Sequence, residues 1–321
     1  MKQVISYVNT GLLRAKQEFN TNRQRRLENE ETSPPSLIEP RFEYGIIVCA
    51  MRLFGPQMSR YYDALLAVHP DLSPECIASV ASESLVRTAQ RCRDELHIPV
   101  VGVDIAGAEN GYKASNHKKA FDIAHGYFFN KTVHAGEGYG PESVFQAVRD
   151  LHAERIGHGF HMFSEDLITA PQNISNRSEY IRRLTKYLCD RRINVEVCLT
   201  SNLGTMPTLV LQDHACGRML AAGVSVSINT DNRLMSRTNT IIELRKAVDS
   251  FHMTPAQLKG VVMNGFKRSF YHGDYMERCA YIRSVADYFD GIAEMYGMQV
   301  AECKFSSADY LKEKDMHLCN T

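Results

Sequence analysis

The sequence predicts an α/β fold in which parallel strands alternate with helices, and two observations carry this prediction. Six short runs of apolar and β-branched residues recur along the chain, and a segment with helical periodicity follows each run. Strands buried on both faces read as such continuous runs, and helical crossovers between them imply a parallel sheet. The six predicted strands are Tyr44–Met51, Val100–Ile105, Lys131–His134, Arg155–Gly159, Asn194–Leu199 and Val224–Asn229.

The segments between these strands carry helix start patterns. Ser73 precedes Pro74, which places a capping residue before a proline at the first helical position. Gly140 and Pro141 open another predicted helix, and residues 254–257 (Thr-Pro-Ala-Gln) have the capping-box pattern. Residues 1–19 are predicted to form an amphipathic N-terminal helix.

Polar stretches mark the predicted loops. Residues 20–40 are dense in Arg, Glu, Ser and Pro and predict a flexible loop, and residues 170–178 predict a shorter polar insertion. The chain has no internal repeat and no interdomain linker. Residues 1–303 are therefore interpreted as one barrel domain, and residues 304–321 as a C-terminal tail.

Composition excludes several classes of partner. Lys+Arg and Asp+Glu balance at 37 each, so no basic field attracts nucleic acid or an anionic membrane. The apolar runs fall far short of the roughly 20 residues that a membrane helix needs. No signal peptide is predicted, and the nine cysteines form no CxxC pair. We therefore expect a cytoplasmic protein with reduced, buried thiols; the oligomeric state is not indicated.

Chemically active residues follow the ends of the later strands. These are His134 and Glu137 after one strand, His158 in the next, and Asp231 after the last. The carboxyl ends of parallel barrel strands meet at one rim, where catalytic groups converge. Each residue alone is more commonly structural, but together they suit a zinc-type site, in which imidazole and carboxylate ligands hold a metal that lowers the pKa of bound water towards about 7.

The motifs around these residues are similar to those of the adenosine deaminase family. They are residues 132–137 (TVHAGE), 155–159 (RIGHG) and 227–231 (SINTD), supported by 103–107 (VDIAG) and 198–202 (CLTSN). The similarity runs from about residue 1 to about residue 300. The resemblance implies a (β/α)8 TIM-type barrel and zinc-dependent hydrolytic deamination of adenosine or 2′-deoxyadenosine to inosine and ammonia. It implies a purine nucleoside as the small-molecule partner and Zn²⁺ as the cofactor.

The resemblance also implies roles for the motif residues. His134 and Asp231 would be zinc ligands, and Asp231 would also orient the attacking water. Glu137 would donate a proton to the purine ring nitrogen beside the attacked carbon, which requires a protonated carboxyl group. His158 would act as a base or an electrostatic stabiliser.

Two further residues would contact the substrate. Gly107 would present its backbone to the purine. Asn232 stands where many relatives have a second aspartate, and its amide would donate a hydrogen bond to a ring nitrogen. The sequence shows no basic cluster that would form a phosphate pocket, which favours a nucleoside over a nucleotide.

One family feature is missing from the sequence. The family supplies two more zinc ligands from a His-x-His on its first strand, but the first histidine here is His69, in a helix–loop context. We therefore expect about six of the eight barrel strands. Two main explanations stay open: an N-terminally incomplete chain of an active deaminase, or a catalytically inactive binding protein. A different metal hydrolase of the same superfamily is a third.

Overall fold

One parallel sheet organises the molecule. The computed structural model describes residues 1–29, 37–169, 176–298 and 300. Its sheet runs in chain order from β1 to β6. All six predicted strands are confirmed, and each end lies within two residues of the predicted one. They are β1 (Ile46–Met51), β2 (Val100–Ala106), β3 (Asn130–Ala135), β4 (Arg155–His158), β5 (Asn194–Val197) and β6 (Ser225–Ile228).

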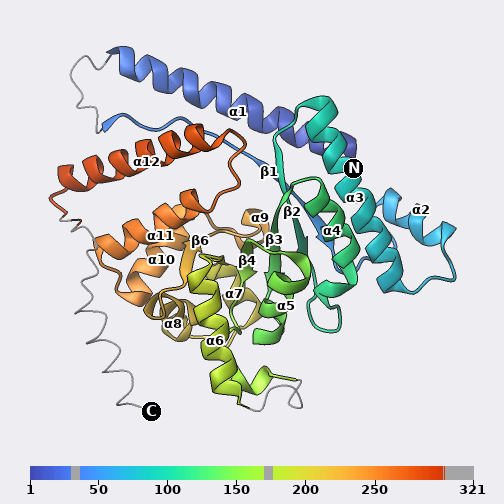
Figure 1. Cartoon of the computed structure of the whole chain (residues 1–321). Coiled ribbons are helices and arrows are strands. Elements are labelled where there is room, and N and C mark those ends of the chain that lie inside the picture. Colours follow the sequence, from blue (N-terminus) through green and yellow to red (C-terminus); the bar gives the residue numbers. More distant parts are fainter. Residues whose placement is uncertain (30–36, 170–175, 299, 301–321) are drawn as a thin grey trace.

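Helices connect the strands and cover one face of the sheet (Figure 1). They are α1 (Lys2–Asn29), α2 (Arg60–Val68), α3 (Pro74–Leu96), α4 (Lys118–Gly126), α5 (Pro141–Leu151), α6 (Arg177–Asp190), α7 (Leu199–Thr205), α8 (Ala215–Ala221), α9 (Arg233–Ser236), α10 (Thr240–Phe251), α11 (Pro255–Lys267) and α12 (Tyr275–Met295). The three predicted starts are confirmed: Ser73 caps α3, Gly140 precedes α5, and Thr254 forms a capping box at α11.

The sheet is open between its first and last strands. Within the described residues, β1 pairs with β2, β6 pairs with β5, and the two edge strands do not pair with each other. A closed eight-stranded barrel has no such edges. The structure thus agrees with the prediction of a TIM-type barrel in which about six of the eight strands are present.

Alternate residues of the strands face two different environments, as the two-residue period of a strand requires. One set is apolar and fully buried beneath the helices: Val103, Val133, Ile156, Val195 and Val226. The other set is polar and lines the opposite face: Asp104, Thr132, His134, Glu196 and Ser227. The sheet therefore builds its core on one side and presents hydrogen-bonding groups on the other.

Phe270 closes the end of the polar face where the strands begin. The guanidinium of Arg155 lies over its ring, 3.9 Å from the centroid. A Cβ atom at Gly102 would come within 2.8 Å of the Phe270 ring, so a glycine is required on β2 at this point. Phe270 and Arg155 therefore occupy the end of the polar face that is opposite to the carboxyl ends of the strands.

The predicted flexible loop at residues 20–40 is wrong for its first half, because α1 continues as a helix to residue 29 (Figure 1). Polar side chains of α1 bind the segment that leads into β1. Asn20 both donates to and accepts from the backbone of Phe42, at 3.1 and 2.9 Å. Lys16 pairs with Glu43. These contacts stabilise helical residues whose composition alone predicts disorder. Residues 30–36 lie outside the described residues.

The remaining segment predictions have mixed outcomes. Residues 170–175 of the predicted insertion lie outside the described residues, and Asn176 caps α6. The predicted tail 304–321 also lies outside them, so the extent of the domain stays a prediction. No helix in the described part of the chain is long and apolar enough to cross a membrane. The cysteines it contains are free thiols, but Cys49, Cys76 and Cys279 are exposed rather than buried.

Candidate active site

The loop after β3 is held by a single buried carboxylate. Glu109, 6% exposed, accepts hydrogen bonds from four successive backbone amides, those of residues 136–139, at 2.7–3.1 Å. The hydroxyl of Ser143 donates a fifth. Gly136 has a φ of +73°, and a Cβ atom there would lie 2.8 Å from Val144. These five hydrogen bonds to Glu109, here called the Glu109 cradle, fix the backbone of the loop. The predicted proton donor, Glu137, projects from this loop.

His134 is oriented by a carboxylate on the neighbouring strand. Its Nδ1 lies 3.1 Å from Asp104 on β2, which leaves Nε2 as the ring nitrogen available to another partner. Burial disfavours the charged ring, but the carboxylates of Asp104, Glu196 and Asp231 together outweigh burial and raise the pKa of His134 to about 9. A carboxylate that holds one nitrogen of an imidazole is a common support for a metal-ligating histidine.

His158 is fixed by a chain of hydrogen bonds that ends on the backbone. The Cys216 N–H donates to Nδ1 of His214 at 3.0 Å, so the proton of the neutral His214 ring lies on Nε2. That nitrogen is 3.1 Å from Oδ1 of Asn202, and the Asn202 amide nitrogen is 3.3 Å from Nδ1 of His158. Nδ1 of His158 therefore accepts, and its Nε2 carries the proton, 3.8 Å from Glu137.

Burial keeps both rings of this chain neutral. Burial lowers the pKa of His214 to about 4, and His158, which is 1% exposed, also has a lowered pKa because it is buried. A neutral imidazole with its proton on Nε2 can donate a hydrogen bond into the site. In that form the same nitrogen cannot accept a proton.

Asp231 and Asn232 form the turn that follows β6. Asp231 has a φ of +53°, a strained conformation for a residue with a side chain, and its Oδ2 accepts a 2.7 Å hydrogen bond from Ser201. Its negative charge acts to raise the pKa of both His134 and His158. Asn232 caps α9 through Oδ1 at 3.3 Å, so its amide N–H group is the part left to face a ligand.

Gly107 lies directly after β2 at the same rim. Its φ of +103° is a conformation that favours glycine, and a Cβ atom there would only reach ordinary contact with Arg52. The structure therefore brings the carboxyl ends of β2, β3, β4 and β6 together, as the strand-end pattern predicts.

The two predicted metal ligands are of the chemical type that zinc prefers, but two ligands are too few for a catalytic zinc site. His134 and Asp231 are an imidazole and a carboxylate, which are zinc donors, but a catalytic zinc takes three or more protein ligands. No group of three or more His, Cys, Asp or Glu side chains within the described ranges could hold a metal ion. These residues can thus supply two ligands of a metal site.

Three supporting residues were not assigned a role from the sequence. Glu109 has no sequence signal because its hydrogen-bond partners are backbone amides. His214 has none because it acts on His158 only through the side chain of Asn202. Arg52, 1% exposed, donates 2.6 Å hydrogen bonds to the carbonyls of Tyr112 and His134. An arginine directly after the apolar run of β1 is the one signal in the sequence that could point to it.

Comparisons with known proteins agree with this geometry. The model of the adenosine deaminase family matches residues 74–286. The adenosine deaminase of Mycolicibacterium vanbaalenii is 35% identical over 204 residues, covering 64% of this chain and 54% of that protein. The chain spans about half the length of the curated relatives it matches.

Solved structures share the fold. A Burkholderia ambifaria amidohydrolase with bound zinc has a TM-score of 0.57 at 23% identity, covering 68% of this chain and 55% of that one. The Arabidopsis protein ADAL, complexed with IMP, has a TM-score of 0.56 at 20% identity, covering 78% of this chain and 59% of that one. At these identities the likeness concerns the fold alone.

Proposed function

The chain belongs to the adenosine deaminase family, and we propose that it carries the proton-transfer half of a site for zinc-dependent deamination of adenosine and 2′-deoxyadenosine to inosine and ammonia. The observation that carries this proposal is the pairing of Glu137 with His158 at the ends of β3 and β4. Glu109 holds the backbone of the first residue, and the Asn202–His214 chain holds the ring of the second.

Glu137 is the proposed proton donor to the ring nitrogen beside the carbon that loses its amino group. Protonation of that nitrogen makes the neighbouring carbon more electrophilic, so water adds more readily. His158, which carries its proton on Nε2, donates a hydrogen bond to the oxygen that adds. We therefore favour electrostatic stabilisation by His158 over the alternative role as a base.

Asn232 and Gly107 are the proposed purine contacts. The Asn232 side chain is oriented by its cap on α9, which points the amide donors away from the helix. Such a donor matches an acceptor nitrogen of the purine without a change of protonation. Gly107 allows the ring to approach the backbone closely.

Zinc is the proposed cofactor. The family is metal-dependent, and one neighbour of the same fold contains zinc. A zinc ion held by His134, Asp231 and at least one further ligand would supply a water with a pKa near 7 at the attacked carbon. The Asp104 carboxylate on Nδ1 of His134 supports this assignment, because it directs Nε2 towards the site.

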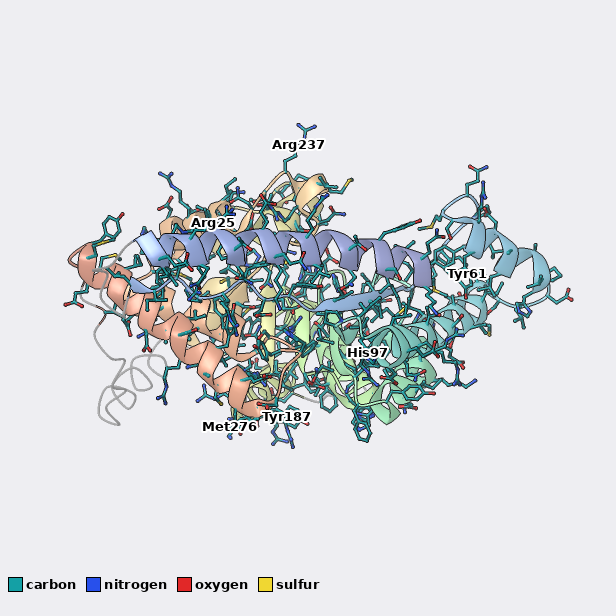
Figure 2. All side chains as sticks on the ribbon, turned by 90° about the horizontal axis from the view of Figure 1, so that it is seen from above. Arg25, Tyr61, His97, Tyr187, Arg237 and Met276 are labelled. Atoms are coloured by element: carbon teal, nitrogen blue, oxygen red, sulfur yellow. The ribbon has the colours of Figure 1, made fainter. Side chains whose placement is uncertain are left out.

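A nucleoside is the proposed substrate. The buried Arg52 is engaged with two backbone carbonyls. Arg237, at the end of α9, points outward into solvent (Figure 2). Neither cation is placed to receive a substrate phosphate. The likeness to an IMP complex makes nucleotides the competing substrate class, and a cytoplasmic location stays a prediction from the sequence.

The test is formation of inosine from adenosine by the purified chain with added Zn²⁺, followed by chromatography. Glu137→Gln should abolish the product, whereas Glu294→Gln, an exposed change on α12, should not alter it. AMP and N6-methyl-AMP serve as competing substrates. A higher kcat/KM for either nucleotide than for adenosine would contradict the nucleoside proposal.

A catalytically inactive binding protein is the second candidate. It is favoured because no three potential metal ligands are grouped together in the described part of the chain. It predicts a folded, zinc-free chain that makes no inosine. Zinc retained at one equivalent per chain after dialysis, and lost in His134→Ala, would contradict this candidate.

A further inference from the structure

A second pocket lies at the opposite end of the sheet from the candidate active site. Its volume is about 580 Å³, and it is formed where β3, β4 and β5 begin and by the turn between α11 and α12. Figure 2 shows Tyr187, which lines it, beside Met276 at one edge of the molecule, while Arg237, after the active-site turn, projects from the opposite edge. The strand starts separate this pocket from the catalytic rim.

Arginine dominates the lining of this pocket. Arg155 is neutralised by Glu196 at 2.5 Å. The other four have no carboxylate within 4 Å among the described residues: Arg191, Arg192, Arg268 and Arg278. They come from two separate segments, which is why the sequence shows no basic cluster. The fold brings these two segments together at one pocket.

The carboxylates at the pocket are already engaged. Glu154 pairs with Lys131 at 3.1 Å. Asp274 caps α12 by accepting from the backbone of Glu277 at 2.8 Å. Neither group is positioned to neutralise the four arginines.

The arginines also repel one another and leave donors unused. Burial lowers the pKa of Arg268, and the charges of Arg192 and Arg278 lower it further. The Nε atoms of Arg268 and Arg278 are buried without a hydrogen-bond partner in the described structure. Buried donors are normally paired, and guanidinium groups bind phosphate oxygens with charge-assisted hydrogen bonds. An anion in the pocket would relieve the repulsion among these guanidinium groups.

We propose that this pocket binds a phosphate monoester of nucleotide size. The clustered guanidinium groups select the phosphate. The volume is within the range of small-molecule sites, about 300–1,000 Å³, and far exceeds one phosphate group. Tyr187 and Tyr271 line the same pocket and supply aromatic surface for an organic part of the ligand. This inference is independent of the proposed function, because the two sites share no residue.

Isothermal titration calorimetry on the whole chain tests the proposal, with AMP and inorganic phosphate as probes. Arg192→Gln should weaken AMP binding at least about tenfold. Arg182→Gln on α6 removes the same charge outside the pocket and should leave the affinity unchanged. Arg192 is exposed, so the variant should keep the wild-type circular dichroism spectrum and melting temperature.

Each other outcome overturns the proposal. Equal weakening by Arg192→Gln and Arg182→Gln would show a general charge effect. Weakening by Asn232→Ala but not by Arg192→Gln would place AMP in the candidate active site. Phosphate binding as tightly as AMP would show a simple anion site. Binding of single-stranded RNA but not of AMP would show a nucleic-acid surface instead.

Discussion

Replacing Glu109 with glutamine should destabilise the fold, because the carboxylate accepts more hydrogen bonds than an amide can. One oxygen accepts from the backbone N–H groups of residues 137, 138 and 139, and the other accepts from Gly136 and Ser143. In Glu109→Gln, an NH₂ group must replace one of these oxygens. The least damaging orientation places it opposite Gly136, whose N–H then has no acceptor.

The magnitude follows from this count. A buried donor without an acceptor costs about 1–3 kcal/mol, and each of the three remaining hydrogen bonds loses its charge assistance, about 1 kcal/mol each. A buried carboxylate is itself costly to desolvate, and glutamine removes that cost. We expect a net loss of about 2–3 kcal/mol, which is about 1 M in the urea midpoint if m is about 3 kcal/mol/M.

Urea unfolding followed by circular dichroism measures this loss. Glu294→Gln on α12 is the matched control, since Glu294 is exposed and its side chain takes part in no hydrogen bond or ion pair within the described residues. Glu109→Asp keeps the charge but shortens the side chain, so it should also destabilise the protein. If Glu109→Asp were as stable as the wild type while Glu109→Gln was destabilised, the negative charge would matter and the number and geometry of the hydrogen bonds would not. Two stable variants would refute the reasoning altogether.

Three more predictions concern other buried groups. Burial lowers the pKa of His117 from 6.5 to about 4, so the unfolded chain takes up a proton first as the pH falls. The contribution of His117 to stability should drop by about 3 kcal/mol between pH 6.5 and 4. In urea unfolding at several pH values, His117→Gln should remove this part of the pH dependence and leave the part that comes from His214. His214→Ala should let the proton of His158 move between both ring nitrogens, which long-range ¹H–¹⁵N NMR spectra detect, and an unchanged spectrum would sink the proposed chain. Arg52→Lys reaches only one of two carbonyls, so it should lower thermal stability by about 2 kcal/mol, with Arg245→Lys on α10 as an unaffected control.

The sequence predicts well what depends on local pattern. The sequence predicts all six strands and three helix starts. Strands buried on both faces appear as continuous apolar runs, and helix caps appear as particular residues at the start of a helix. The helix over residues 20–29 is not predicted, because α1 is stabilised there by contacts such as those between Asn20 and Phe42, more than 20 residues apart. Composition shows that such a segment is polar, but it does not show which distant residues will form hydrogen bonds with it.

The candidate site divides in the same way. Glu137 and His158 lie in motifs, so the sequence identifies them directly. Glu109 and His214 act through backbone amides or through another side chain, and neither kind of contact has a sequence pattern. The fold was needed to show that they hold the two motif residues in place.

The two ends of the sheet also differ in how they treat buried charge. At the carboxyl end, two buried carboxylates have counterparts: Asp104 faces His134, and Glu109 faces a row of amide donors. At the other end, burial lowers the pKa of the half-buried Arg268, and the nearby like charges of Arg192 and Arg278 lower it further. Like charges held close together destabilise one another unless an anion lies between them. The balanced end is thus suited to hold a neutral nucleoside, and the unbalanced end to hold an anion.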